Sequence, residues 1–247
     1  RKVSPEQWNQ LYNNQITLED IQRVNEKPEV SLNIPSWLQQ TKIFATRDML
    51  SKWSNKQYLW INLLEAPLLA IVLSYIIRYV EVPGTEYIFR TNENIPAFIF
   101  MSIIVMLFVG LTVSAEEIFR DQKILKREKF LNLSRSSYLI SKIGILFTLS
   151  AIQSLLFVLI GNTVVGISGM YWDYWWMLFT VSCFANLLGL NISASFNSAV
   201  TIYILIPIIV IPQMILGGAM FSFDKLNDSI GGGKQIPPMI AEVMVSR

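Results

Sequence analysis

Five long apolar runs, separated by shorter polar segments, dominate the pattern of hydrophobic and polar residues along the chain. A transmembrane helix needs about 20 mostly apolar residues to cross the hydrocarbon core of a bilayer, and each run approaches or exceeds that length. The pattern therefore predicts an all-α membrane protein with five transmembrane helices. We expect these helices at about residues 58–80, 95–115, 139–165, 171–192 and 199–220.

Polar segments frame this transmembrane domain. Residues 1–35 are hydrophilic and are expected to form short helices and a cytoplasmic linker, whereas residues 221–247 contain glycines and prolines that predict an external loop. Residues 36–57 combine a helical pattern of apolar residues with positive charge, which is typical of an amphipathic helix lying along a membrane surface. The alternative is an extension that only anchors the chain. The apolar and basic residues concerned are Trp37, Ile43, Phe44, Leu50, Trp53, Lys42, Arg47, Lys52 and Lys56.

Basic residues gather on one side of the expected spans. The segment between the first and second spans carries Glu81, Glu86 and Glu93 against a single Arg90. The segment between the second and third spans is rich in lysine and arginine, which mark the cytoplasmic side of a membrane protein. We therefore expect the N-terminus in the cytoplasm of a cell whose inner (plasma) membrane holds the protein. The basic residues of that segment are Arg120, Lys123, Lys126, Arg127, Lys129, Arg135 and Lys142.

Composition narrows the chemistry that the chain can perform. Charged residues make up 15% of the sequence, against about 25% in a typical soluble domain, and the formal net charge of +2 gives no reason to expect a nucleic-acid partner. The sequence has no histidine, which removes the commonest general base and a common metal ligand. Its one cysteine, Cys183, lies in an apolar run, so the sequence predicts neither a disulfide framework nor a metal site. Catalysis would have to depend on carboxylates, lysine, serine or tyrosine.

The segment 115–130 is the expected cytoplasmic segment with the richest mixture of side chains. It combines Ile118, Phe119, Ile124 and Leu125 with charges of both signs. Such a helix can lie flat below the membrane and present charged groups to a cytoplasmic partner. The pattern alone favours a solvated hairpin that follows the positive-inside rule.

Short sequence stretches in and after this segment resemble a known family of transporters. Glu117-Ile-Phe, Ile124-Leu-Lys-Arg-Glu128 and Ser137-Tyr-Leu-Ile-Ser-Lys142 are similar to the loop between the second and third helices of ABC exporters of the ABCG (White/pigment) type. Two further stretches, Ile211-Pro-Gln-Met-Ile-Leu-Gly-Gly218 and Phe221-Ser-Phe-Asp-Lys-Leu226, resemble the end of the fifth helix of that family and the start of its external loop. The spacing resembles that of bacterial members whose ATPase precedes the permease.

The resemblance implies a permease half with six helices that works as a homodimer or heterodimer. The chain has no G-x-x-x-x-G-K-[ST] phosphate-binding loop, so ATP and Mg would be bound by a nucleotide-binding domain that is a separate chain or lies before Arg1. Residues 1–35 would be the linker behind that domain. Because the chain starts without a methionine and stops at Arg247, we expect it to be a fragment whose sixth helix would follow.

The resemblance also implies roles for individual residues. Positions matching Glu117, Arg127 and Glu128 form a polar relay that couples ATP hydrolysis to alternating access of the spans, and Lys142 is a further candidate for this relay. Opposite charges there could exchange partners between two states. We expect Glu128→Ala to leave ATP binding intact while it uncouples hydrolysis from transport in proteoliposomes.

Polar and apolar positions within the spans offer further candidates. Glu65 is the acid of the first span and lies beside Pro67; a structural role near the interface and a substrate or proton role both remain open. The family places its substrate cavity between the second and fifth helices of two subunits. The resemblance therefore makes Met101, Phe108, Ile208 and Gln213 candidates for the lining of this cavity. The apolar character of the first three suggests a lipidic or amphipathic substrate.

Two other functions remain as alternatives to an ATP-driven permease. A membrane-embedded enzyme that modifies lipids would lack histidine and any cluster of carboxylates at membrane depth. A structural membrane subunit would have no transport cycle. Dependence on an ATPase that co-purifies with the chain distinguishes the permease from both.

Overall fold

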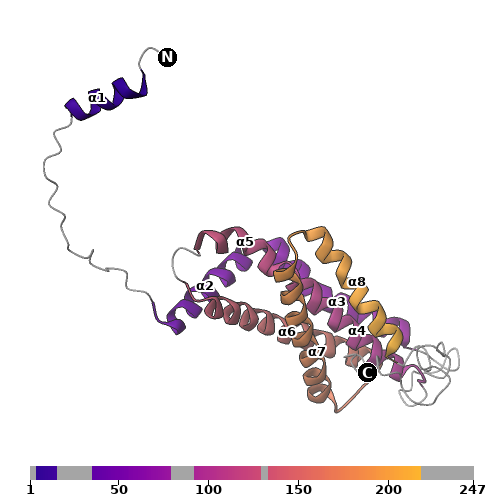
Figure 1. Cartoon of the computed structure of the whole chain (residues 1–247). Coiled ribbons are helices and arrows are strands. Elements are labelled where there is room, and N and C mark those ends of the chain that lie inside the picture. Colours follow the sequence, from indigo (N-terminus) through magenta and orange to yellow (C-terminus); the bar gives the residue numbers. More distant parts are fainter. Residues whose placement is uncertain (1–3, 16–34, 79–91, 129–132, 218–247) are drawn as a thin grey trace. The chain divides into compact units, whose positions relative to one another are not determined.

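The computed structural model describes residues 4–15, 35–78, 92–128 and 133–217, and within these ranges it contains helices and no strands (Figure 1). The chain divides into two compact units, residues 1–34 and 35–247. In the first unit, helix α1 (Pro5–Gln15) begins at a proline and exposes Trp8, Leu11 and Tyr12.

The second unit contains seven described helices, five of which are long and apolar enough to cross a membrane. The five are α3, α4, α6, α7 and α8, so the prediction of an all-α membrane protein with five spans is confirmed. Two shorter or more polar helices, α2 and α5, precede α3 and follow α4. The bounds are α2 Trp37–Ser54, α3 Lys56–Ile77, α4 Ile95–Ser114, α5 Glu117–Glu128, α6 Arg135–Val165, α7 Tyr171–Ser195 and α8 Ala199–Leu216.

Some helix ends differ from those expected, and local caps explain two of the differences. The helix expected over residues 36–57 ends at Ser54, because the side chain of Asn55 accepts a hydrogen bond from the amide of Tyr58 and starts α3. The helix that contains the third expected span begins at Arg135, four residues before the expected start of the span, since the Ser134 hydroxyl caps the amide of Ser137. The fifth helix is described to Leu216; residues 218–220, like the expected loop at 221–247, lie outside the described residues.

Helix α4 lies at the centre of the packing and makes its most extensive contact with α7. A Cβ atom added at Gly110 of α4 would lie 2.7 Å from the Cβ of Ala185 on α7, a distance that real side chains do not tolerate. Gly189 of α7 likewise faces Ser114 of α4 with no room for a side chain. Small residues therefore let the two backbones approach closely, as is usual between membrane helices. Helix α4 also contacts α8, and Ile104 and Leu107 belong to one apolar cluster that joins residues of α4, α7 and α8.

Helix α2 packs against α6 with a face that combines polar and apolar side chains. Gln40 and Phe44 are buried there, and the Gln40 side-chain oxygen accepts a hydrogen bond from the amide of Ser134 at 2.8 Å. Of the apolar residues expected to share one face of this helix, Phe44 is buried, whereas Ile43, Leu50 and Trp53 are exposed. Charged residues on the same side of α2 as Gln40 and Phe44 can therefore contact charged residues of other helices.

Candidate functional site

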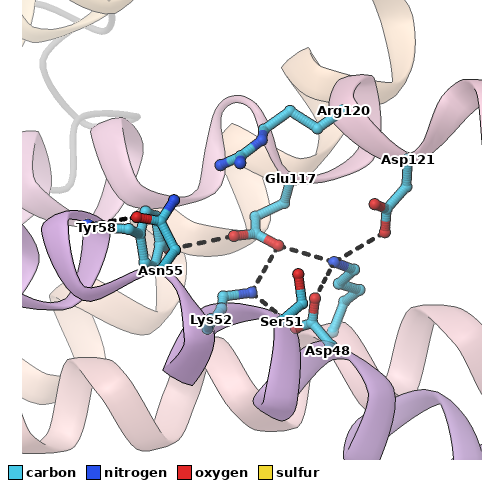
Figure 2. Close-up of a pocket in the computed structure, with 9 residues that line it drawn as sticks. Asp48, Ser51, Lys52, Asn55, Tyr58, Glu117, Arg120 and Asp121 are labelled. Carbon is cyan, nitrogen blue, oxygen red and sulfur yellow. Dashed lines mark hydrogen bonds and ion pairs between the residues drawn. The ribbon is translucent and has the colours of Figure 1, made fainter.

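Five charged side chains meet where α2, α5 and α6 come together beside the start of α3 (Figure 2). Asp48 and Lys52 come from α2, Glu117 and Asp121 from α5, and Lys142 from α6. We call these five residues the charged cluster. They line a cavity of about 150 Å³ together with Ser51, Asn55, Tyr58 and Arg120.

Lys142 is the hub of the charged cluster. Its Nζ lies 2.9 Å from Glu117 Oε2, 2.9 Å from Asp121 Oδ2 and 2.5 Å from Asp48 Oδ1. A lysine ammonium has three N–H donors, so three carboxylates satisfy it completely. Because the Lys142 side chain is only 4% exposed, these carboxylates take the place of the water that would otherwise solvate it.

Glu117 is the carboxylate with the most partners in the cluster. Its Oε2 accepts hydrogen bonds from Lys52 at 2.8 Å and from Lys142 at 2.9 Å, and its Oε1 accepts one from the Tyr58 hydroxyl at 3.2 Å. Figure 2 shows dashed lines that join the carboxylate of Glu117 to Lys52 and to Tyr58. One side chain at the start of α5 is therefore tied to α2, α3 and α6.

Asp48 shares both lysines with Glu117. Its second carboxylate oxygen is 2.7 Å from Lys52 Nζ, one turn further along α2. Burial raises the pKa of Asp48, but the ammonium groups of Lys52 and Lys142 outweigh that effect and hold its pKa below the ordinary value of 3.8. Asp48 is therefore ionised at neutral pH, as its two ion pairs require.

The cluster approaches charge balance only when its surroundings are included. Three carboxylates face two ammonium groups, and the guanidinium of Arg120 lines the same cavity. In Figure 2 Arg120 extends over the cluster from the same helix as Glu117 and Asp121. Arg120 therefore supplies a third positive charge to the cavity.

Neighbouring hydrogen bonds fix the helices that carry the cluster. The buried hydroxyl of Ser193 on α7 accepts hydrogen bonds from the amides of Ile118 at 3.0 Å and Phe119 at 2.9 Å, which satisfies two of the free N–H groups at the start of α5. The Tyr138 hydroxyl donates to Asp121 at 2.9 Å. Trp37 at the start of α2 donates through Nε1 to Ser136 at 3.0 Å.

Such a cluster acts as an ionic joint between helices. Removing one partner of a buried ion pair costs about 3–5 kcal/mol, because the other charge is left without water or a counter-ion. A movement of α2 or α5 relative to α6 must therefore exchange ion pairs and cannot simply separate them. That property favours discrete arrangements over gradual sliding. Within the described ranges, no group of His, Cys, Asp and Glu is arranged to hold a metal ion.

Of the four residues expected to couple, two meet in this cluster. Glu117 and Lys142 are direct partners, at 2.9 Å. Arg127 is exposed and lies about 15 Å further along α5 than Glu117, at 1.5 Å per residue. Glu128 is the last residue of α5, and its side chain lies outside the described part of the structure. The coupling roles of all four stay predictions.

The four residues expected to line a substrate cavity are spread over α4 and α8. Met101 is half-buried and Gln213 is buried, whereas Phe108 and Ile208 are exposed. Phe108 lines a groove beside α3 that also contains Glu65. The other three line neither this groove nor the cavity of the charged cluster. Their role in substrate binding also stays a prediction.

Sequence reasoning missed Asp48, Asp121 and Tyr58 and counted Lys52 only as part of a basic helix face. The one available signal was the spacing of Asp48 and Lys52, which brings them together on a helix surface. That spacing is common on solvated helices and gives no hint of a buried site. The contacts of Lys142 with Asp48, 94 residues away, and of Lys52 with Glu117, 65 residues away, follow only from the folded chain.

The fold and the charged cluster place this chain among multi-pass helical membrane proteins in which buried ion pairs connect helices. A family model described as "ABC-2 type transporter" matches residues 39–238, which is most of the chain. The chain belongs to the ABC-2 type transporter family and forms a transmembrane permease of an ABC transporter. Membership implies that it works with an ABC ATPase partner. A comparison with individual curated proteins finds no match.

Proposed function

We propose that this permease is half of a dimeric, ATP-driven exporter of lipidic or amphipathic molecules, and that the charged cluster transmits the motion of the ATPase to the spans. The single observation that carries the proposal is the buried junction of α2, α5 and α6 through Lys142 and its three carboxylates. A rigid-body displacement of α5 would act on the span α6 through this junction.

The position of α5 supports a contact with the ATPase. It is a short charged helix between the spans α4 and α6, and its described surface exposes Lys123, Lys126 and Arg127. The concentration of lysine and arginine in this connection favours a cytoplasmic location, which would put the N-terminus on the same side. The charged cluster would then lie between the ATPase and the spans, at the inner membrane of the cell.

The resemblance to ABCG-type permeases supports a division of labour along α5. Glu117, at its start, would belong to the ionic joint, whereas Arg127 and Glu128, at its end, would contact the ATPase. ATP and Mg would be bound by that partner, and two permease copies would enclose the pathway between them. The transport cycle would alternate the access of that pathway, with the ion pairs of the cluster exchanging partners between the two states.

Separate measurement of hydrolysis and transport tests this proposal. The permease and its ATPase are reconstituted in proteoliposomes, and ATP hydrolysis is measured alongside ATP-dependent export of a fluorescent amphiphile. Glu117→Gln keeps the size and hydrogen-bonding capacity of the side chain but removes the charge that pairs with Lys52 and Lys142. We expect it to retain ATP hydrolysis and to lower the amphiphile exported per ATP by at least about tenfold, equivalent to 1.4 kcal/mol.

The matched control is Arg135→Gln, which removes an exposed charge from the first turn of α6. It should leave both activities close to those of the wild-type protein. Normal export per ATP in Glu117→Gln would refute the role of the cluster. If neither the wild type nor any variant exports the amphiphile in the presence of ATP, the proposed transport of amphiphiles is refuted. The effect of each substitution on the ATPase would then be judged from the rate of ATP hydrolysis alone.

A further inference from the structure

An open groove runs along α3 beside α4, and its lining is almost entirely apolar. It has a volume of about 460 Å³, which falls in the range of about 300–1,000 Å³ typical of sites for small molecules. Trp60, Leu64 and Leu68 of α3 recur every fourth residue and form one stripe along the helix, and Phe108 of α4 lies across from it. All four are exposed, so the groove is open to an occupant.

Among the described residues that line this groove, Glu65 is the one that carries a charge. It is half-buried, and no side chain in the described ranges forms an ion pair with it or donates a hydrogen bond to it. At 1.5 Å per residue, Glu65 lies about 14 Å along α3 from Lys56, well inside the span. An ionised carboxylate at such depth costs several kcal/mol unless a proton or a cation neutralises it.

We propose that this groove binds a cationic amphiphile, with its ammonium group at Glu65 and its hydrocarbon chain along the apolar stripe. The charges are complementary, because the groove offers one carboxylate that has no partner among the described residues, and the lining residues that the structure describes include no positive group. The rings of Trp60 and Phe108 add surfaces that attract an ammonium group. Leu64 and Leu68 offer apolar side chains for van der Waals contact with the methylene groups of the chain.

This site is separate from the charged cluster. None of the residues that line the groove lines the cavity of the cluster. The inference therefore goes beyond the proposed coupling role, and binding can fail while coupling holds, or the reverse.

Photo-crosslinking tests the inference on the full chain in nanodiscs of zwitterionic phospholipid. The probe is an alkyl trimethylammonium that carries a diazirine in its chain, and mass spectrometry maps the labelled peptides. We expect saturable labelling of the peptides that contain Leu64 and Phe108. Unlabelled alkyl trimethylammonium should compete, whereas an alkyl alcohol and an alkyl sulfate of the same chain length should not.

Two variants and a rescue locate the interaction. Glu65→Gln, which is close to isosteric, should weaken binding of the probe at least about tenfold, as loss of a charge pair in an apolar setting predicts. Glu65→Asp keeps the charge and should restore most of the affinity. Leu68→Trp fills the groove and should abolish labelling while size-exclusion chromatography shows an unchanged particle.

Three results would overturn the inference. Equal affinity of the wild type and Glu65→Gln would show that the carboxylate takes no part in binding. Equal competition by the alcohol would mean that the groove holds neutral amphiphiles beside a protonated Glu65. Absence of labelling, together with a disulfide between two copies carrying Leu64→Cys in a Cys183→Ser background, would assign this face of α3 to a second copy of the chain.

Discussion

Glu117 and Glu65 are both carboxylates of this membrane protein, yet their surroundings have nothing in common. Glu117 accepts hydrogen bonds from two lysines and a tyrosine and is 7% exposed. Glu65 faces an apolar groove and has no described partner. In the first environment the charge is compensated within the protein, whereas in the second the compensation must come from outside it.

Burial alone therefore does not assign a role to a charged residue of a membrane protein. A carboxylate surrounded by cations holds helices together, so its removal should be felt in stability. A carboxylate without partners contributes no such contact, so its removal should be felt only by a ligand. Substitution of Glu117 should therefore lower the stability of the protein, whereas substitution of Glu65 should lower its affinity for a ligand.

The largest effect is expected at the hub of the charged cluster. Lys142→Met leaves Asp48, Glu117 and Asp121 close together with one ammonium group fewer, and loss of a buried ion partner costs about 3–5 kcal/mol. Thermal unfolding of the purified protein in detergent should show a large fall in Tm. Arg135→Met, at an exposed position on the same helix, serves as control. Equal stability of Lys142→Met and the wild type would mean that the cluster does not hold the helices together.

A smaller loss of stability should follow when the start of α5 loses its cap. Ser193→Ala removes the acceptor of the amides of Ile118 and Phe119, and loss of a helix cap costs about 0.5–2 kcal/mol. Hydrogen exchange should report faster exchange of these two amides. The control is Ser195→Ala on the same helix, where the hydroxyl is exposed and bonds only to the carbonyl of Asn191. Unchanged protection in Ser193→Ala would contradict the role of Ser193 as the cap of α5.

The pH dependence of the cluster should be weak near neutrality. The pKa of Asp48 is lowered in the folded protein, so its ionised form adds stability above the unfolded value of 3.8 and loses it as the pH falls through the lowered pKa. The destabilisation caused by Asp48→Asn should therefore be constant between about pH 8 and pH 5 and shrink only in stronger acid. Unfolding of the two proteins in denaturant at several pH values checks this. A destabilisation that disappears near pH 6 would show that the pKa of Asp48 is raised.

The smallest effect on stability is expected at Glu65. Without a bound cation, a proton neutralises Glu65 and avoids the cost of an ionised carboxylate in the span. Glu65→Gln then removes no charge, and no ion pair or hydrogen bond seen in the described residues, so the unfolding free energy should change by no more than about 0.5 kcal/mol. Thermal unfolding of Glu65→Gln and Glu117→Gln under the same conditions compares the changes in Tm caused by loss of each carboxylate. Equal destabilisation by the two substitutions would remove the distinction between them.

The sequence pattern predicted the spans but not the charged cluster. The reason is that the residues of a span are neighbours in the sequence, whereas those of the cluster are far apart in it. A span is a local property, because about 20 consecutive apolar residues are enough to recognise it. Glu117 and Lys142 were found by resemblance to a family and not by physical reasoning. Their partners Asp48 and Lys52 lie on α2, and neither the spacing nor the charge of this helix indicates which side faces the bundle.

By itself, the sequence determined the all-α fold, its five spans and the lone acid of the first span, because hydropathy and charge act on each segment independently of the rest. Only the tertiary structure decided that Asp48, Asp121 and Tyr58 join Glu117 and Lys142, and that Glu65 faces an apolar groove. Helices separated by dozens of residues must pack before these side chains can meet. The close approach of α4 and α7, which Gly110 and Gly189 allow, and the cap from Ser193 on α7 set the place of Glu117.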